Sequence, residues 1–218
     1  MKRRSLSVGR LVGIGLLVVL LVAMVLNTKF LTPAELAAAG PVKFDPNQTA
    51  NELFDKAKSE LPAQAEPLGE VITAIQADPK SAAAKFKAVS PAENAYVFPV
   101  KADGTVTDAS KDSLRLQVPG VPAETPIIVP LTTAINGSVL RDAMGFKFAD
   151  APGQTDYQYV GDELKKLIQA DLSSSISDPA GLKGKKVSVV GVVNVLVTGS
   201  PPPKAKPTNI QPLTVKAS

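Results

Sequence analysis

An uncharged apolar run near the amino terminus constrains this chain more than any other feature. The run, LVGIGLLVVLLVAMVLNT, extends from Leu11 to Thr28 and contains no charged residue. At ~1.5 Å per helical residue it reaches roughly 27 Å, close to the thickness of the hydrocarbon core of a bilayer. Lys2, Arg3, Arg4 and Arg10 precede it, and basic residues on that side predict a cytoplasmic amino terminus. The run therefore predicts a single-pass signal anchor in a bacterial cytoplasmic membrane, with the rest of the chain extracytoplasmic.

A cleaved signal peptide is the alternative interpretation of the same region. Residues 37–40, AAAG, have the small side chains of a cleavage site. However, the apolar run is already long for a signal peptide, and Lys29 and Glu35 separate it from these residues. We therefore prefer an uncleaved anchor with its basic tip in residues 1–28, a tether in residues 29–43, and an extracytoplasmic domain in residues 44–218.

The chain contains no histidine and no cysteine, and these absences narrow the chemistry that it can perform. Histidine is the commonest general base and metal ligand, and cysteine supplies thiolate catalysis, disulfides and thiolate metal sites. Zinc hydrolases and Ser-His-Asp or Cys-His triads are therefore excluded. We expect no metal, no cofactor and no enzymatic activity.

The net charge of +4 arises entirely from the four basic residues before the apolar run. The remaining chain holds 20 of the 24 basic residues against all 20 acidic residues, so it is neutral overall. A nucleic-acid-binding domain would carry a basic face in its folded part. The sequence therefore predicts no nucleic-acid partner, and the lipid bilayer is the partner that it indicates most directly.

Apolar periodicity divides the extracytoplasmic part into helices followed mainly by strands. Asp45-Pro46 and Asp78-Pro79 each predict a helix start, with aspartate as the N-cap and proline at the first helical position. From Tyr96 the apolar period changes to two, interrupted by a helical stripe over residues 156–172. This order predicts an α+β fold, in which helices pack on a curled antiparallel sheet with one inserted helix.

Three positions within the predicted strands indicate irregularities. Pro99 favours an edge strand or a bulge, because proline has no N–H for a central ladder. Asp103-Gly104 is typical of a hairpin turn. Gly191 interrupts the valine-rich run over residues 186–197, and a glycine inside so long a strand favours a sharp bend or a bulge.

The richest polar stretch is INGSVLRDAMGF, residues 135–146, and two backbone conformations fit it. Asn136-Gly137 favours a type I′ hairpin. Alternatively, Ser138 caps a short helix over residues 139–144 that ends at Gly145. The sequence leaves both conformations open.

The side chains of this stretch also form the candidate binding site, which consists of Asn136, Ser138, Arg141 and Asp142. Arg141 offers a planar fork for a carboxylate or phosphate, and Asp142 could orient it or accept hydrogen bonds from sugar hydroxyls. The preferred alternative is structural, because turn chemistry alone explains Asn, Gly and Ser here. In that interpretation Arg141 and Asp142 tie the short helix to neighbouring strands.

A carboxylate-dependent hydrolase is a further alternative. Asp142, Asp150 and Asp156 lie near one another in the sequence, and paired carboxylates can act as general acid and base. Such a site would need these side chains together in a cleft.

Short segments spread along the chain carry a family resemblance. The most distinctive is INGSVLRDA (135–143), and the others are FD (44–45), ADP (77–79), YVFPVKADGTV (96–106), FKFAD (146–150), LKGKKVSVVG (182–191) and IQPLTV (210–215). In these segments the chain resembles a bacterial envelope family of predicted periplasmic lipoproteins, domain of unknown function 2291. The resemblance implies an OB-like barrel with added helices, and an accessory role beside a sugar-type ABC importer. Family members typically carry a lipid-attached cysteine, which this chain lacks.

The leading interpretation is therefore a non-enzymatic, membrane-anchored accessory or binding protein, associated with a sugar-type ABC importer. The alternative is a periplasmic module that binds a small sugar or anion near Arg141. The resemblance transfers no catalytic residue.

Overall fold

The computed structural model describes residues 8–28, 32, 35, 44–197 and 206–217, and these divide into two compact units between Lys43 and Phe44. The first unit contains helix α1, Val8–Asn27, whose described large apolar side chains are exposed. Among the described residues, we find no helix with both the length and the apolar character needed to cross a membrane. The single-pass anchor stays a prediction, and all of the predicted tether except residues 32 and 35 lies outside the described residues.

The second unit begins with three helices, α3 (Pro46–Gln64), α4 (Leu68–Ala77) and α5 (Pro79–Lys85). The Asp45 carboxylate accepts a hydrogen bond from the backbone N–H of Asn47 at 2.9 Å, and the Asp78 carboxylate accepts one from Ser81 N–H at 3.0 Å. These bonds satisfy backbone donors that the first helical turn leaves without a partner. Both Asp-Pro helix starts predicted from the sequence are confirmed.

The strands of this unit form one mixed sheet with the order β7-β5-β4-β3-β6-β8, and β1 and β2 also pair with β3. Most pairs are antiparallel, and the exceptions are β1 with β3 and β5 with β7. The strands are β1 (Glu66–Pro67), β2 (Val89–Ala92), β3 (Ala95–Ala109), β4 (Ser113–Gln117), β5 (Ile127–Pro130), β6 (Lys186–Leu196), β7 (Thr208–Asn209) and β8 (Gln211–Ala217).

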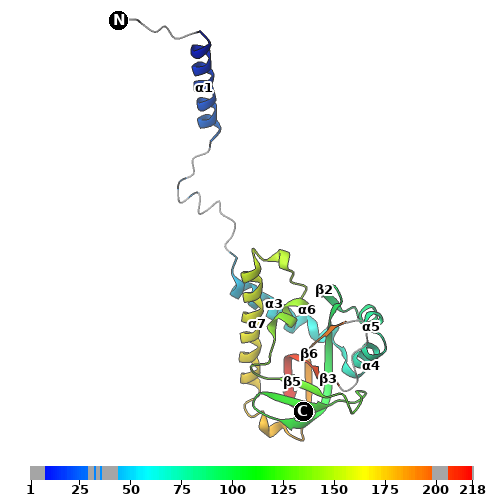
Figure 1. Ribbon diagram of the computed structural model, residues 1–218. Coiled ribbons are helices and arrows are strands. Elements are labelled where there is room, and N and C mark those ends of the chain that lie inside the picture. The colour runs from blue at the N-terminus through cyan, green and yellow to red at the C-terminus, as the bar shows by residue number, and fades with distance from the viewer. Residues whose placement is uncertain (1–7, 29–31, 33–34, 36–43, 198–205, 218) are drawn as a thin grey trace. The chain divides into compact units, whose positions relative to one another are not determined.

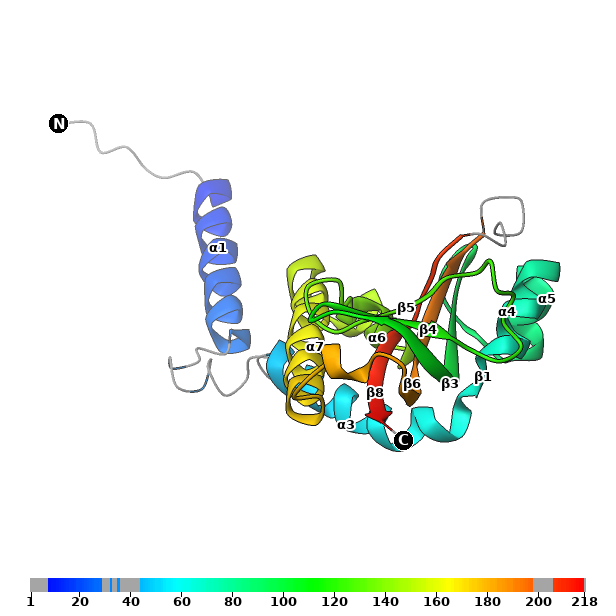
Figure 2. The same ribbon diagram turned by 90° about the horizontal axis from the view of Figure 1, so that it is seen from below.

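The sheet curls on itself, because its two ends belong to one chain segment. β7 and β8 lie at opposite ends of the strand order, yet only Ile210 separates them. The register between β6 and β8 shifts between Val190 and Gly191, so the irregularity predicted at this glycine is confirmed. Figure 2 shows the curled strands between α6 (Gly137–Ala143) and α7 (Gln154–Ser175) on one side and α4 and α5 on the other. The predicted α+β class with a curled, barrel-like sheet is confirmed.

Two predictions within β3, a hairpin turn at Asp103-Gly104 and an edge strand at Pro99, need correction. Asp103-Gly104 is not a hairpin, because β3 runs through it, pairing Gly104 with Val187 of β6, and the chain reverses only after Ala109. The glycine is needed for a different reason: a Cβ at this position would lie 2.7 Å from the Gln117 carbonyl oxygen. Pro99 does not lie in an edge strand, because β3 pairs with β6 on one side and with β1, β2 and β4 on the other. On the other side of β3, neither the β1 nor the β2 register includes Pro99.

Two α-helices are inserted between β5 and β6. The sequence predicted one of them and left the conformation of residues 135–146 open. The two helices are α6 (Gly137–Ala143) and α7 (Gln154–Ser175). The stretch that begins at Asn136 is therefore a helix and not a hairpin. Its N-cap is Asn136 rather than the predicted Ser138, which lies two residues further along the chain, and Gly145 follows its end with a φ of +75°.

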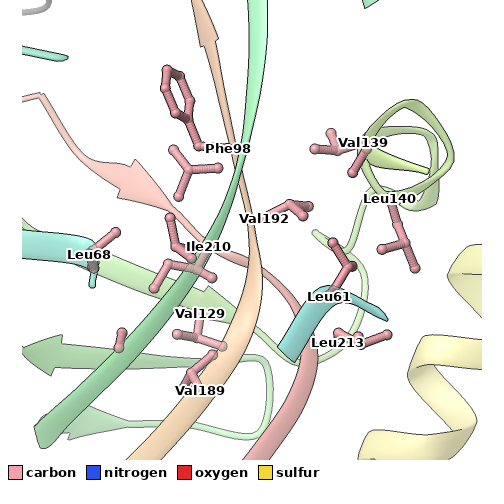
Figure 3. Close-up of a cluster of buried hydrophobic side chains, with 14 of the residues drawn as sticks. Leu61, Leu68, Phe98, Val129, Val139, Leu140, Val189, Val192, Ile210 and Leu213 are labelled. Atoms are coloured by element: carbon pink, nitrogen blue, oxygen red, sulfur yellow. The ribbon is translucent and has the colours of Figure 1, made fainter. Parts of the chain in front are cut away.

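The core lies between the curled sheet and the helices. Figure 3 shows buried side chains from helices and strands meeting there, including Leu61 of α3, Leu68 of α4, Phe98 of β3 and Leu140 of α6. Ile210, the residue that joins β7 to β8, is fully buried in the same cluster. The core therefore holds α6 and the two ends of the sheet in fixed positions.

Candidate functional site

The amino-terminal end of α6 rests directly on α7 through two glycines. A Cβ on Gly137 would clash with the carbonyl oxygen of Gly161 and the backbone nitrogen of Lys165. A Cβ on Gly161 would in turn lie 2.5 Å from the Ser138 hydroxyl oxygen. Gly161 costs the helix some stability, because glycine has a low helix propensity. The close approach of the two backbones explains why a glycine occupies this helical position.

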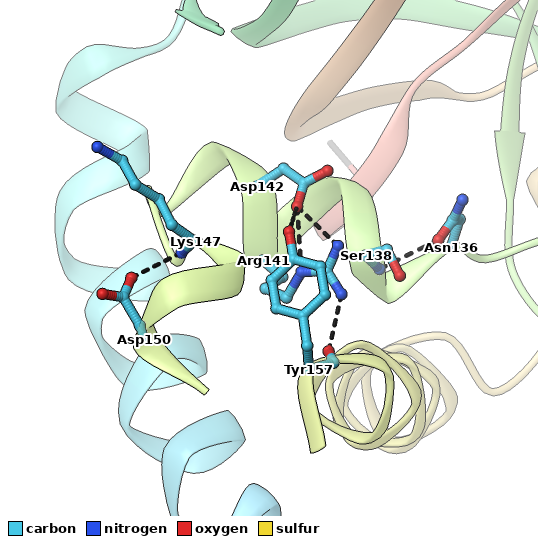
Figure 4. Close-up of polar contacts among 7 residues, drawn as sticks. All are labelled: Asn136, Ser138, Arg141, Asp142, Lys147, Asp150 and Tyr157. Atoms are coloured by element: carbon cyan, nitrogen blue, oxygen red, sulfur yellow. Dashed lines mark hydrogen bonds and ion pairs between the residues drawn. The ribbon is translucent and has the colours of Figure 1, made fainter. Parts of the chain in front are cut away.

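Arg141 lies at the other end of α6 and is almost completely buried, with 6% of its surface exposed. Its Nε and Nη2 donate to Oδ1 of Asp142 at 3.1 and 2.8 Å, and its Nη1 donates to the Tyr157 carbonyl oxygen at 2.8 Å (Figure 4). The guanidinium carbon also lies 3.5 Å from the centroid of the Tyr157 ring. We call Arg141, Asp142 and Tyr157 the Arg141 clasp, because together they fasten α6 to the first turns of α7.

Tyr157 completes the Arg141 clasp from its hydroxyl end. The hydroxyl donates to Oδ1 of Asp142 at 3.2 Å, so this carboxylate oxygen accepts hydrogen bonds from both partners. Burial of the phenol, followed by the negative charge of Asp142, raises the pKa of Tyr157 above its ordinary value. The neutral phenol is therefore the form that the folded protein favours.

The four predicted site residues do not form one cluster. Asn136 and Ser138 lie at the start of α6, where Asn136 Oδ1 accepts from Ser138 N–H at 3.1 Å. Arg141 and Asp142 form the ion pair of the Arg141 clasp at the other end of the helix. The structure therefore joins these residues in two pairs. The Arg141 fork, which the sequence offered to a ligand, is directed at partners within the protein, and those partners lie on α6 and α7 rather than on strands.

The three acidic residues of the hydrolase alternative, Asp142, Asp150 and Asp156, each belong to a different local structure. Asp142 belongs to the Arg141 clasp, and the exposed Asp150 accepts a hydrogen bond from Lys147 N–H at 2.7 Å at the start of a short 3-10 helix. Asp156 is in the first turn of α7, where a negative charge favours the helix dipole. Over the described parts of the chain, we find no group of three or more acidic residues arranged to hold a metal ion.

A hollow of about 300 Å³ lies beside Asn136, and the sequence did not indicate it. Its buried lining residues, which we call the floor, are apolar, and its exposed or half-buried lining residues, which we call the rim, include five with carboxamide side chains: Gln76, Asn136, Asn194, Asn209 and Gln211. These five residues are spread from α4 to the start of β8, so no local motif contains them. One signal was visible: Asn194 is the single polar residue in the apolar run VVGVVNVLV, residues 189–197.

Comparison with known proteins shows the family of this chain. A family model described as predicted periplasmic lipoprotein, domain of unknown function 2291, matches residues 16–214. The chain belongs to this family. The match includes α6, the Arg141 clasp and every residue that lines the hollow. The resemblance inferred from the sequence segments is confirmed. The chain contains no cysteine to which a lipid could be attached.

A solved structure confirms the barrel type of this family member. A crystal structure of an OB-fold protein from Thermotoga maritima aligns with a TM-score of 0.67 at 21% sequence identity. The alignment covers 81% of this chain and all of the other. No curated protein matches the chain in sequence. The likeness therefore establishes an OB-like fold for the second unit and carries no information on activity.

Proposed function

We propose that this protein is held at the cytoplasmic membrane by its amino-terminal segment and presents its OB-like unit on the extracytoplasmic side as an accessory binding module. One observation carries the membrane part of the proposal. The described large apolar side chains of α1, from Val12 to Leu26, each have more than half of their surface exposed. Fully burying one such side chain is worth about 1.5–3 kcal/mol, so the helix strongly favours a nonaqueous environment.

The direction of insertion follows from charge and from family. Four basic residues precede the apolar run and none interrupts it, which favours a cytoplasmic amino terminus. The family of predicted periplasmic lipoproteins is consistent with an extracytoplasmic domain. In this chain, which has no cysteine for lipid attachment, the apolar run takes the place of the lipid.

The absence of cysteine makes the topology straightforward to test. A single cysteine introduced as Asn51→Cys lies on an exposed position of α3, whereas Ser5→Cys lies in the basic tip. In intact spheroplasts, a membrane-impermeant maleimide should label Asn51→Cys, and it should label Ser5→Cys only after permeabilisation. The protein should also stay with membranes in alkaline carbonate. Labelling in the opposite order, or release into the soluble fraction, would overturn the membrane arrangement.

Accessory binding is favoured over catalysis because the candidate acids have structural partners. Asp142 is paired with Arg141, and Asp150 accepts from a backbone N–H. A general acid and base would have to face a common substrate position, and these two side chains instead stabilise α6 and the turn after it.

The partner that we propose is a component of a sugar-type ABC importer, which the family resemblance suggests. Cells expressing the tagged full-length chain would be crosslinked, and proteins that co-purify from the membrane fraction would be identified by mass spectrometry. Enrichment of a permease or solute-binding subunit over a tagged control membrane protein supports the partnership. A preparation without such a subunit would exclude it and leave the membrane arrangement unaffected.

A further inference from the structure

The hollow beside Asn136 lies where two paired strands part. β6 pairs with β8 from Val187 as far as Val192, which lies opposite Gln211. Beyond this point β6 continues to Leu196 against β3, whereas the chain before Gln211 turns away and pairs with β5 at Thr208 and Asn209. The parting strands leave a gap at this end of the barrel, and residues of α4 and α6 border it. The gap is therefore a product of the sheet topology.

The floor of the hollow is part of the protein core. Ile72 and Ile75 of α4, Val139 of α6 and Val193 and Val195 of β6 line it, and each is at most 9% exposed. A floor of buried branched side chains is rigid, because cores are packed as densely as organic crystals. The hollow is thus preformed, which reduces the entropy cost of binding.

The rim of the hollow is rich in carboxamides, and several of their polar atoms are not used by the protein. Gln211 Oε1 accepts from Asn136 N–H at 2.8 Å, which fixes the position of the Gln211 side chain. Gln76 Nε2 donates to Thr125 Oγ1 at 3.3 Å. Within the described residues, the side chains of Asn194 and Asn209 form no hydrogen bond at all. Both residues are exposed, so the donors and acceptors of their side chains lie at the protein surface.

The composition of the rim selects the chemistry of that ligand. Among the residues of the described ranges that line the hollow, Lys206 is the one with a charge, and none carries a carboxylate. A carboxamide offers a donor and an acceptor on adjacent atoms, and a hydroxyl group needs both. Apolar side chains beneath such a rim cover the C–H face of a ring. A volume of about 300 Å³ is at the lower end of the range for ligand pockets, so the ligand is small.

We propose that this hollow is a binding site for a neutral, hydroxyl-rich small molecule, a polyol or monosaccharide, with Asn194 and Asn209 as its principal hydrogen-bonding residues. The proposal does not require the importer partnership, because every described residue that lines the hollow belongs to the second unit. It also places recognition away from Arg141, whose donors are directed at Asp142 and Tyr157.

The test uses the full-length chain, purified in a zwitterionic detergent because glucoside and maltoside detergents would themselves be ligands. Ribose, glucose, galactose and myo-inositol are the probes, and phosphate and citrate are the charged comparisons. Saturation-transfer NMR reports binding, and the thermal midpoint rises when a ligand binds only the native state. We expect saturable binding of at least one polyol and none of the anions. Binding of the anions alone, or of no polyol at millimolar concentration, would overturn the proposal.

Matched variants identify the site of that binding. The double substitution Asn194→Ala and Asn209→Ala should weaken polyol binding by roughly ten-fold or more, because the hydrogen bonds of two side chains are lost. Asn51→Ala, which removes an exposed carboxamide on α3 outside the hollow, should leave the affinity unchanged. Asn194→Asp keeps the side-chain shape and replaces the amide NH2 with a carboxylate oxygen, which removes both N–H donors, so it serves if the double variant fails to fold. Undiminished affinity in these variants would place the polyol elsewhere and refute this site.

Discussion

The Arg141 clasp and the hollow are both rich in polar side chains, and α6 contributes to both, yet they use those groups in opposite ways. In the Arg141 clasp, a guanidinium that is 6% exposed is bonded to a carboxylate, a carbonyl and an aromatic face. In the hollow, the carboxamides of Asn194 and Asn209 have no hydrogen bond to the described residues. Polar groups that are satisfied internally stabilise a fold, whereas unsatisfied groups above an apolar floor are able to bind.

The difference explains why the most conspicuous motif of the sequence is not the best candidate for ligand binding. A ligand at Arg141 would have to displace hydrogen bonds that already exist, so its net gain would be small. A ligand at the hollow replaces water. The comparison predicts that substitutions around α6 act on stability, whereas substitutions around the hollow act on binding.

The largest effect is expected from Gly137→Val. Its side chain would collide with backbone atoms of α7 at Gly161 and Lys165, and a backbone cannot rotate away as a side chain can. Overpacking against a backbone is among the most destabilising changes, and we expect a loss of about 4 kcal/mol or more in the free energy of unfolding. Urea denaturation of the full-length chain measures it. Gly153→Ala is the control, because a Cβ there would have no neighbour within 4 Å. Equal stability of both variants would mean that α6 does not rest on α7.

Removal of the Arg141 guanidinium should have the next largest effect. Arg141→Ala leaves Asp142, whose side chain is 19% exposed, without its cation, and we expect a loss of about 2–4 kcal/mol. Arg141→Lys keeps the charge but not the planar fork or the stacking on Tyr157, so it should recover only part of the loss. Polyol binding by the folded fraction should be retained. If Arg141→Ala instead abolished binding at wild-type stability, the assignment of the two regions would be reversed.

Tyr157→Phe should have a smaller effect with a distinct pH dependence. At neutral pH it removes one hydrogen bond to Asp142, which is worth about 0.5–1.5 kcal/mol. Because the pKa of Tyr157 is raised in the folded state, its contribution to stability is complete below the ordinary value of 10.0 and is lost as pH rises through the folded pKa. Thermal midpoints measured from pH 8 to 11 should therefore converge for the two proteins. A constant difference over that range would contradict the raised pKa.

The smallest effect on stability is expected at the rim of the hollow. Asn194 and Asn209 are exposed, and their side chains form no hydrogen bond within the described residues, so Asn194→Ala and Asn209→Ala should each change the unfolding free energy by no more than about 0.5 kcal/mol. The same urea titrations measure it. A loss comparable to that of Arg141→Ala would show that these carboxamides are structural after all.

Local sequence signals predicted much of this fold correctly, and the errors share a cause. Asp45 and Asp78 were recognised as N-caps because capping depends on bonds within three residues. The Asp103-Gly104 pattern predicts a turn, and this prediction is wrong because Gly104 is in a strand that passes close to Gln117. A glycine that provides φ freedom and a glycine that permits close approach are identical in sequence. Only the position of the neighbouring chain distinguishes them.

The candidate site shows the same division. The sequence identified Asn136, Ser138, Arg141 and Asp142 as a polar group, and the structure separated them into a helix cap and a clasp. The sequence contained no local signal that Gln76, Asn194, Asn209 and Gln211 line one hollow. These residues come together only because β6 and the last chain segment separate beside α4.

By itself, the sequence determined the helix starts, the alternation of the strands, the exclusion of histidine and cysteine chemistry, and the family. These properties depend on composition and on spacings within a few residues. The tertiary structure alone decided that Arg141 is enclosed and that Asn194 is exposed where it lines the hollow, because burial and hydrogen-bond satisfaction depend on which distant segments pack together.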